Sequence, residues 1–219
     1  MRKIFLAAAI AVCVPSAASA RGHRERDATH EAGRFDYYLM SLSWSPSYCE
    51  AHPDESEQCA HKGFGFVLHG LWPQNRDGSW PQHCSTDEQP DAATIDRALA
   101  FMPSRRLVEH EWQTHGSCTG LDPKDYFARA DRAFANVRIP AAMQTPQEPP
   151  SLGADDIVSA FAQTNPGLDE RMITVECRDG GELTEVRVCL NKDTLAPQAC
   201  GGRVRNSCRY GELRIPAVR

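Results

Sequence analysis

An even set of cysteines is the strongest constraint that this sequence places on its fold. Apart from Cys13 near the N-terminus, the cysteines are Cys49, Cys59, Cys84, Cys118, Cys177, Cys189, Cys200 and Cys208. An even number behind an export signal is typical of a disulfide framework formed in an oxidising compartment. Spacing alone leaves about 105 pairings open. The chain has no CxxC pair and no zinc-finger grouping of Cys and His, so the spacing predicts no structural metal.

Residues 1–20 are predicted to be a secretory signal peptide. Met1-Arg2-Lys3 is a short basic start, Ile4–Val14 is apolar, and Ala18-Ser19-Ala20 is a small-residue cleavage pattern. The apolar run is too short to span a bilayer, and no other segment is apolar enough to do so. We therefore expect a periplasmic or secreted protein without a membrane anchor.

The rest of the chain has the length of one domain. We expect a flexible N-terminal lead over 21–34 and a single, monomeric domain over 35–219. The formal net charge of the whole chain is −5. An acidic protein lacks the broad basic face that non-specific binding to nucleic acid requires. Any nucleic-acid chemistry must therefore depend on a few well-placed groups.

Hydrophobic periodicity places strands and helices in separate blocks. It predicts strands over 36–44, 63–70, 171–177 and 183–190, the last two joined by a turn at Asp179-Gly180-Gly181. It predicts helices over 91–101, 104–115 and 155–163, and one that begins after Asp122. Because no βαβ rhythm is present, the expected class is α+β, with a central antiparallel sheet packed against several helices and stapled by disulfides.

The stretch "HEWQTHGSC" (residues 110–118) combines two histidines with a buried helical stripe. A zinc protease needs its histidines four residues apart, whereas His110 and His115 are five apart and about 140° apart around a helix. Val108, Glu111, Trp112 and His115 share one face instead. Burying Glu111 and His115 costs several kcal/mol unless they are partnered. A structural Glu111–His115 hydrogen bond and a catalytic role both remain open.

A second histidine makes a catalytic role more specific. His69 lies at the end of the predicted strand in "FVLHGLWPQ" (residues 66–74), directly before Gly70 and close to Trp72. Two histidines on separate elements can act as general acid and general base near neutral pH. Cleavage of RNA suits such a pair because the 2′-hydroxyl of the substrate is the nucleophile, and the enzyme need not supply one.

These residues resemble a known family. "HGLWPQ" (69–74) and "HEWQTHGSC" (110–118) are similar to the two active-site segments of the ribonuclease T2 family, the secreted acid and S-like ribonucleases. The flanking segments 35–49, 120–127 and 183–193 extend the resemblance over nearly all of the mature chain. The chain thus resembles a bacterial member of this family. It implies a metal-independent endoribonuclease that needs no cofactor. Single-stranded RNA would be cleaved to a 2′,3′-cyclic phosphate and then hydrolysed to a 3′-phosphate, and DNA would not be cut.

The resemblance also implies roles for individual residues. His115 would be the base that activates the 2′-hydroxyl, and His69 the acid that protonates the leaving oxygen. His110 would contact the phosphate, and Glu111 would form a hydrogen bond near it. The substrate-binding residues would include the aromatic base platforms Trp72 and Trp80.

One position departs from the family pattern. Thr114 stands in the substrate-binding segment where the family often has a lysine. A hydroxyl cannot supply that positive charge to the pentacovalent phosphate, so the activity is expected to be reduced or differently tuned. This departure keeps an alternative open, namely a catalytically weak or silent relative that acts as an RNA-binding or toxin/inhibitor module.

The resemblance finally proposes a disulfide pairing that spacing could not give. The implied bonds are Cys49–Cys59, Cys84–Cys118, Cys177–Cys208 and Cys189–Cys200. The second of these would tie the segment after the first histidine motif to the end of the second motif, and so help to fix His69 against His115.

Overall fold

A computed structural model describes residues 31–144, 148, 150–209 and 211–218. The predicted signal peptide and most of the predicted lead therefore lie outside the described residues. The described part contains one antiparallel sheet of four strands in the order β2-β1-β4-β3. The strands are β1 (Tyr37–Trp44), β2 (Phe66–Gln74), β3 (Ile173–Arg178) and β4 (Glu182–Asn191). The predicted α+β class, with a central antiparallel sheet, is confirmed.

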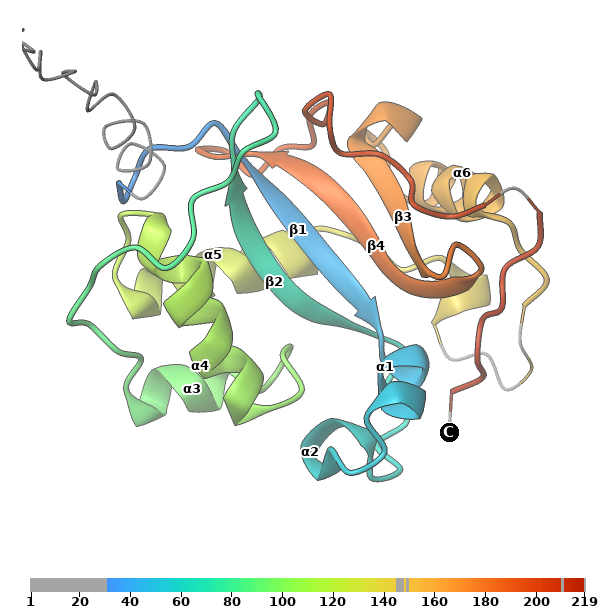
Figure 1. Cartoon of the computed structure of the whole chain (residues 1–219), viewed down its shortest axis with the longest axis horizontal. Helices are drawn as coiled ribbons and strands as arrows, with labels where there is room; N and C mark the ends of the chain where they lie inside the picture. The colour runs from blue at the N-terminus through green and yellow to red at the C-terminus, as the bar shows by residue number, and fades with distance from the viewer. Residues whose placement is uncertain (1–30, 145–147, 149, 210, 219) are drawn as a thin grey trace, which may run out of the picture.

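Within the part of the chain that the structure describes, six α-helices flank this sheet (Figure 1). The described helices are α1 (Ser45–Ala51), α2 (Ser56–Cys59), α3 (Ala92–Ala98), α4 (Arg105–Thr114), α5 (Pro123–Ala135) and α6 (Ala154–Thr164). Helices α3, α4 and α5 lie toward the β2 edge, whereas α6 lies beside β3 (Figure 1). No helix among the described residues combines the length and the apolar character that crossing a membrane requires.

Strand β1 is buried on both faces. Its residues Tyr38, Met40, Leu42 and Trp44 belong to the main hydrophobic core between the sheet and the helices. Tyr37 and Leu39 point to the opposite face, where they form a smaller apolar cluster with Cys189. The opposite face is therefore partly closed, and its remaining polar part carries the candidate site.

Local signals in the sequence account for several element ends. Ser104 caps α4, because its hydroxyl accepts a hydrogen bond from the backbone N–H of Leu107 at 3.2 Å. Asp122 caps α5 in the same way, and Pro123 occupies the first helical position. In the β3–β4 hairpin, Asp179 and Gly180 have positive φ angles, as a tight hairpin turn requires. The predicted helix starts near residue 104 and after Asp122, and the predicted turn after residue 178, are confirmed.

Two predictions of local structure are wrong. The Cys49–Cys59 segment, for which no helix was predicted, contains the end of α1 and the short helix α2. The second strand, predicted over 63–70, begins at Phe66 and continues to Gln74, so His69 lies inside a strand. Strand β2 continues through Pro73 because β2 is an edge strand, where a proline without an N–H is tolerated.

A β-bulge sets the direction of the His69 side chain. Ser41 pairs with Gly70 and Leu42 pairs with Leu68, so the register of β1 and β2 skips His69. Leu68 and Leu71 both enter the core although they are three residues apart, because the extra residue shifts the alternation of faces. The bulge thus lets the strand return its apolar residues to the core and leaves His69 beside the polar face.

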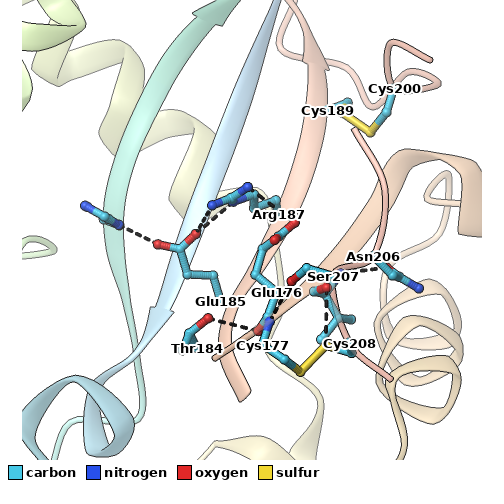
Figure 2. A network of polar contacts seen from close by, with 12 residues as sticks. Glu176, Cys177, Thr184, Glu185, Arg187, Cys189, Cys200, Asn206, Ser207 and Cys208 are labelled. Carbon is cyan, nitrogen blue, oxygen red and sulfur yellow. Dashed lines mark hydrogen bonds and ion pairs between the residues drawn. A yellow bond between two sulfur atoms is a disulfide. The ribbon is translucent and has the colours of Figure 1, made fainter. Parts of the chain in front are cut away.

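The structure contains all four implied disulfides. Cys84–Cys118 joins the segment before α3 to the turn after α4, and Cys49–Cys59 closes the α1–α2 segment. Cys177–Cys208 and Cys189–Cys200 tie the C-terminal segment to β3 and β4, respectively (Figure 2).

Candidate active site

Three aromatic rings from two elements meet at the β2 edge of the sheet. His69 and Trp72 come from β2, and His115 is the residue that caps the C-terminus of α4. The ring centroid of Trp72 lies 5.1 Å from that of His69, nearly edge-on, and 5.2 Å from that of His115. The structure therefore brings the two predicted acid–base histidines to the same indole.

Glu111 lies between these elements in full burial. Its Oε2 accepts a hydrogen bond from the indole N–H of Trp72 at 2.7 Å, and its Oε1 lies 3.6 Å from Nε2 of His69. The Nδ1 atom of His115 has no hydrogen-bond partner among the described residues. The alternative of a structural Glu111–His115 hydrogen bond is therefore wrong, because the carboxyl group turns toward β2.

Gly70 makes this approach possible. A β-carbon at position 70 would lie 1.9 Å from Oε2 of Glu111 and 2.3 Å from the indole nitrogen of Trp72. The backbone of Gly70 is paired with Ser41 within the strand, so Gly70 does not serve to turn the chain. What the site requires at this position is the absence of a side chain.

Burial controls the protonation of Glu111. Removal from water raises the pKa of its carboxyl group to about 7, although the charge of His69 and the hydrogen bond from Trp72 act in the opposite direction. Glu111 is thus a neutral acid at mildly acidic pH and can donate a hydrogen bond there.

Glu185 on β4 fixes the ring of His69. Its Oε1 lies 2.7 Å from Nδ1 of His69. The guanidinium of Arg187 contacts Glu185 at 2.6 Å and Glu176 at 3.3 Å, and it lies 5.3 Å from the centroid of Trp72. Figure 2 shows Glu176, Arg187 and Glu185 as one chain of ion pairs across β3 and β4. With Nδ1 of His69 held by Glu185, Nε2 is the nitrogen left for chemistry.

The pKa values of the two histidines are shifted in opposite directions. Burial lowers the pKa of His69, but the hydrogen bond that its Nδ1–H donates to Glu185 and the charges of Glu111 and Glu185 outweigh this effect, so the pKa is raised overall. Burial and the positive charges of nearby histidines lower the pKa of His115 to about 3. Glu185 stays ionised, because His69 and Arg187 outweigh its burial and lower its pKa to about 2. One imidazole thus favours the protonated form and the other the neutral form.

Three further residues surround His115. His110 lies on the exposed surface of α4, where partial removal of its ring from water, together with neighbouring positive charges, lowers its pKa. His83, which was not among the predicted site residues, is close enough to lower the pKa of both His110 and His115. Thr114 is only 6% exposed, and its hydroxyl is buried without a partner among the described residues. The burial of this hydroxyl counts against direct contact of Thr114 with a phosphate.

Two pockets flank the aromatic cluster. One, of about 390 Å³, contains His115, Trp72 and Trp80 in its lining. The other, of about 240 Å³, contains His69 and His110. Trp80 is 50% exposed, whereas Trp72 is partly buried among His69, His115 and Arg187. Of the two predicted base platforms, Trp80 therefore offers the more accessible ring.

Sequence reasoning missed Glu185 and Arg187. The signal was present in "LTEVRVCL", where strict alternation places both residues on the face opposite Val186 and Val188. Nothing in the sequence indicated that this face of β4 would meet β2 across β1. Among the described residues, no group of three or more His, Cys, Asp or Glu side chains is arranged to hold a metal ion.

Comparison with known proteins identifies the family that this chain resembles. The model of the ribonuclease T2 family matches residues 35–200. A ribonuclease of Aeromonas hydrophila is 36% identical over 201 residues, which cover 86% of this chain and 89% of the relative. Ribonuclease DdI of Dictyostelium discoideum is 28% identical over 204 residues, which cover 85% and 86%. The fold is similar to that of an RNase-related protein from Calystegia sepium, with a TM-score of 0.66 and 22% identity over 85% of this chain and 99% of that chain.

Proposed function

The chain belongs to the ribonuclease T2 family, and we propose that it cleaves single-stranded RNA without a metal ion, using His115 as base and His69 as acid. The observation that carries this proposal is the opposite shift of the two imidazole pKa values at one indole. Environments that push two titratable groups apart identify which is the acid and which is the base.

In the first step, the neutral ring of His115 takes the proton of the 2′-hydroxyl. The 2′-oxygen attacks phosphorus, and the bond from phosphorus to the 5′-oxygen breaks. His69 donates the proton on Nε2 to this leaving oxygen, so the products are a 2′,3′-cyclic phosphate and a free 5′-hydroxyl. DNA lacks the attacking hydroxyl and is not a substrate.

In the second step, the two rings exchange roles. His69, now neutral, removes a proton from water as the water oxygen attacks phosphorus. The bond to the 2′-oxygen breaks, and His115 returns its proton to that oxygen. A 3′-phosphate remains, and both histidines recover their starting forms.

Stabilisation of the phosphorane is assigned to His110, with Glu111 as a positioning residue. His110 and His69 line the same pocket, and Glu111 reaches the same cluster from α4. Glu111 is fully buried, so it does not contact the phosphate directly. Its carboxyl group instead accepts the hydrogen bond from the indole of Trp72 and lies 3.6 Å from Nε2 of His69, and it thereby holds the proposed acid in place.

Because His115 and His69 line different pockets, their proposed roles determine which way the RNA strand runs across the site. The ribose whose 2′-hydroxyl attacks must lie beside His115, and hence in the pocket that also contains Trp80. The leaving nucleoside lies beside His69, in the pocket that also contains His110. The scissile phosphate spans the cluster between them.

Glu185→Gln is expected to move the alkaline limb of the kcat/KM–pH profile to lower pH. The carboxylate raises the pKa of His69, and an amide in its place removes the charge. At pH values above the limb, each unit of pKa lost by His69 lowers kcat/KM about tenfold. At pH values low enough for His69 to be protonated in both proteins, little change is expected.

Glu182→Gln is the matched control for this prediction. Glu182 also lies on β4, but its partners are Arg178 and Arg214, away from the histidines. If the profile of Glu185→Gln superimposes on that of the wild type and of Glu182→Gln, the assignment of Glu185 as a positioning residue for His69 is wrong.

Product analysis on RNA with and without chelator tests the function as a whole. We expect transient 2′,3′-cyclic phosphate ends, then 3′-phosphate ends, at the same rate with EDTA. Activity that EDTA abolishes and zinc restores would contradict the proposal. RNA binding without cleavage at any pH would favour the alternative of a silent RNA-binding or inhibitor module, for which Thr114 is the motivating residue.

The place of action is proposed to be outside the reducing cytosol. Four disulfides are rare in reducing compartments and typical of exported proteins. Mass analysis of the protein isolated from its native cells tests the predicted export, which requires removal of residues 1–20.

A further inference from the structure

Arginines line one side of the pocket that contains His115. They are Arg187 from β4, and Arg203 and Arg205 from the segment after Cys200. Arg187 is neutralised by Glu185 and Glu176. By contrast, among the described residues no ion pair joins Arg203 or Arg205 to a carboxylate, and both side chains are exposed. Two cations thus face a substrate pocket in a chain whose net charge is −5.

The segment that carries these arginines is held in place at both ends. The Cys189–Cys200 bond fixes its start to β4, and the Cys177–Cys208 bond fixes its end to β3 (Figure 2). Between them, the side chain of Asn206 accepts a hydrogen bond from the backbone N–H of Val175 at 2.8 Å. The segment is therefore tied to the same strands that position Glu185 and Arg187.

Arg203 also packs directly on the loop that carries Trp80. Gly78 has a positive φ of 83°, and a β-carbon there would lie 2.2 Å from Cδ of Arg203. Asp77 is near as well: hydrogen bonds from Ser79 chiefly lower its pKa, and the charge of Arg203 adds to this effect. The stem of Arg203 is thus seated against the loop that carries Trp80, and both residues line the same pocket. Among the described residues, no ion pair engages its guanidinium.

Arg205 keeps most of its donors free in the same way. Its Nε donates a hydrogen bond to the backbone oxygen of Gly202 at 3.2 Å, which orients the guanidinium. The two terminal nitrogens have no partner among the described residues. A guanidinium with two free terminal nitrogens matches the geometry of a phosphate, which accepts paired hydrogen bonds from arginine.

We propose that Arg203 and Arg205 form a second phosphate subsite, which binds the RNA phosphate on the 5′ side of the nucleotide that occupies the His115 pocket. The direction rests on the proposed function, because His115 as base places the attacking ribose in this pocket. Its base lies on Trp80, and the next phosphate toward the 5′ end meets the two arginines. The subsite extends recognition beyond the scissile bond and offsets the acidic character of the rest of the chain.

A terminal phosphate added to a dinucleotide tests this subsite separately from the site of the scissile phosphate. The probes are the dinucleoside monophosphate that the enzyme cleaves fastest, the same molecule with an added 5′-phosphate, and the same molecule with an added 3′-phosphate. For the wild type, the 5′-phosphate is expected to raise kcat/KM on the order of tenfold, because it gains charge-assisted hydrogen bonds. The 3′-phosphate is not expected to do so.

The double variant Arg203→Gln/Arg205→Gln is expected to lose this gain and to cleave the unphosphorylated dinucleotide at the wild-type rate. Arg132→Gln is the matched control, because Arg132 is an exposed arginine on α5 outside both pockets. It should retain the full gain. The proposed subsite is contradicted if the 5′-phosphate does not raise kcat/KM in the wild type, or if the rise persists in the double variant. An equal rise from the 3′-phosphate would also contradict it.

Binding of the corresponding deoxydinucleotides separates this proposal from the catalytic one. They lack the nucleophile, so their dissociation constants, measured by tryptophan fluorescence, do not depend on cleavage. A preference for the 5′-phosphorylated form that disappears in the double variant supports the subsite even if RNA is not cut. Cleavage of RNA without such a preference would support the proposed ribonuclease function and contradict the proposed subsite.

Discussion

His115→Ala is expected to lower kcat/KM on RNA by about 10²–10⁴-fold, the usual contribution of a general base. The ring contacts Trp72 and is partly buried at the end of α4, so alanine removes the base without breaking the helix. His69→Ala is expected to lose a similar factor, because the leaving oxygen then departs without a proton. Initial rates on single-stranded RNA, together with circular dichroism as a check of folding, measure both losses.

The leaving group distinguishes the two histidines. A nucleoside 3′-(para-nitrophenyl phosphate) releases a nitrophenolate that needs no proton to leave. The defect of His69→Ala should therefore shrink on this substrate, whereas the defect of His115→Ala should stay as large as on RNA. The reverse pattern would show that His69 is the base and His115 the acid. Full activity of either variant on RNA would show that its histidine takes no part in catalysis.

Gly70→Ala is expected to lose most activity and about 1–3 kcal/mol of unfolding free energy, as overpacking of a closed site does. The added methyl group would overlap the Glu111 carboxyl group and the indole nitrogen of Trp72. Because Glu111 is fully buried, it cannot swing into solvent, and its hydrogen bond to Trp72 must break. Urea unfolding and kcat/KM on RNA measure the two effects.

Gly181→Ala is the control for this substitution. A β-carbon at Gly181 meets no atom within 4 Å, and its φ is not in the left-handed region. It should leave activity unchanged. If Gly70→Ala is as active as Gly181→Ala, the close packing of Glu111 against β2 is not a requirement of the site.

The fold class and the histidine pair were predictable because their signals are local. Ser104 and Asp122 cap helices through side chains next to them in sequence, and the two histidine motifs are contiguous stretches. The end of β2 was mispredicted because Pro73 indicates a turn unless the strand is known to be an edge. Edge position is a property of the whole sheet, and no local pattern shows it.

The support for His69 was unpredictable for the same physical reason. Glu185 is 116 residues away from His69 in the sequence, and the two meet only because β4 and β2 are both neighbours of β1. The bulge at His69 likewise depends on the register of β1 against β2, which the sequence of either strand alone does not contain. Resemblance supplied the disulfide pairing and the roles of the histidines, whereas the structure supplied the groups that set their protonation.

The central claim is that His69 and His115 are held in opposite protonation states in the free enzyme. Nuclear magnetic resonance titration of the labelled imidazole rings, assigned with the two alanine variants, measures it directly. The ring of His115 is expected to stay neutral until the pH falls to about 3, and that of His69 to stay protonated above the ordinary histidine pKa. Titration of both rings together near pH ~6.5, or of His115 above His69, would contradict the account.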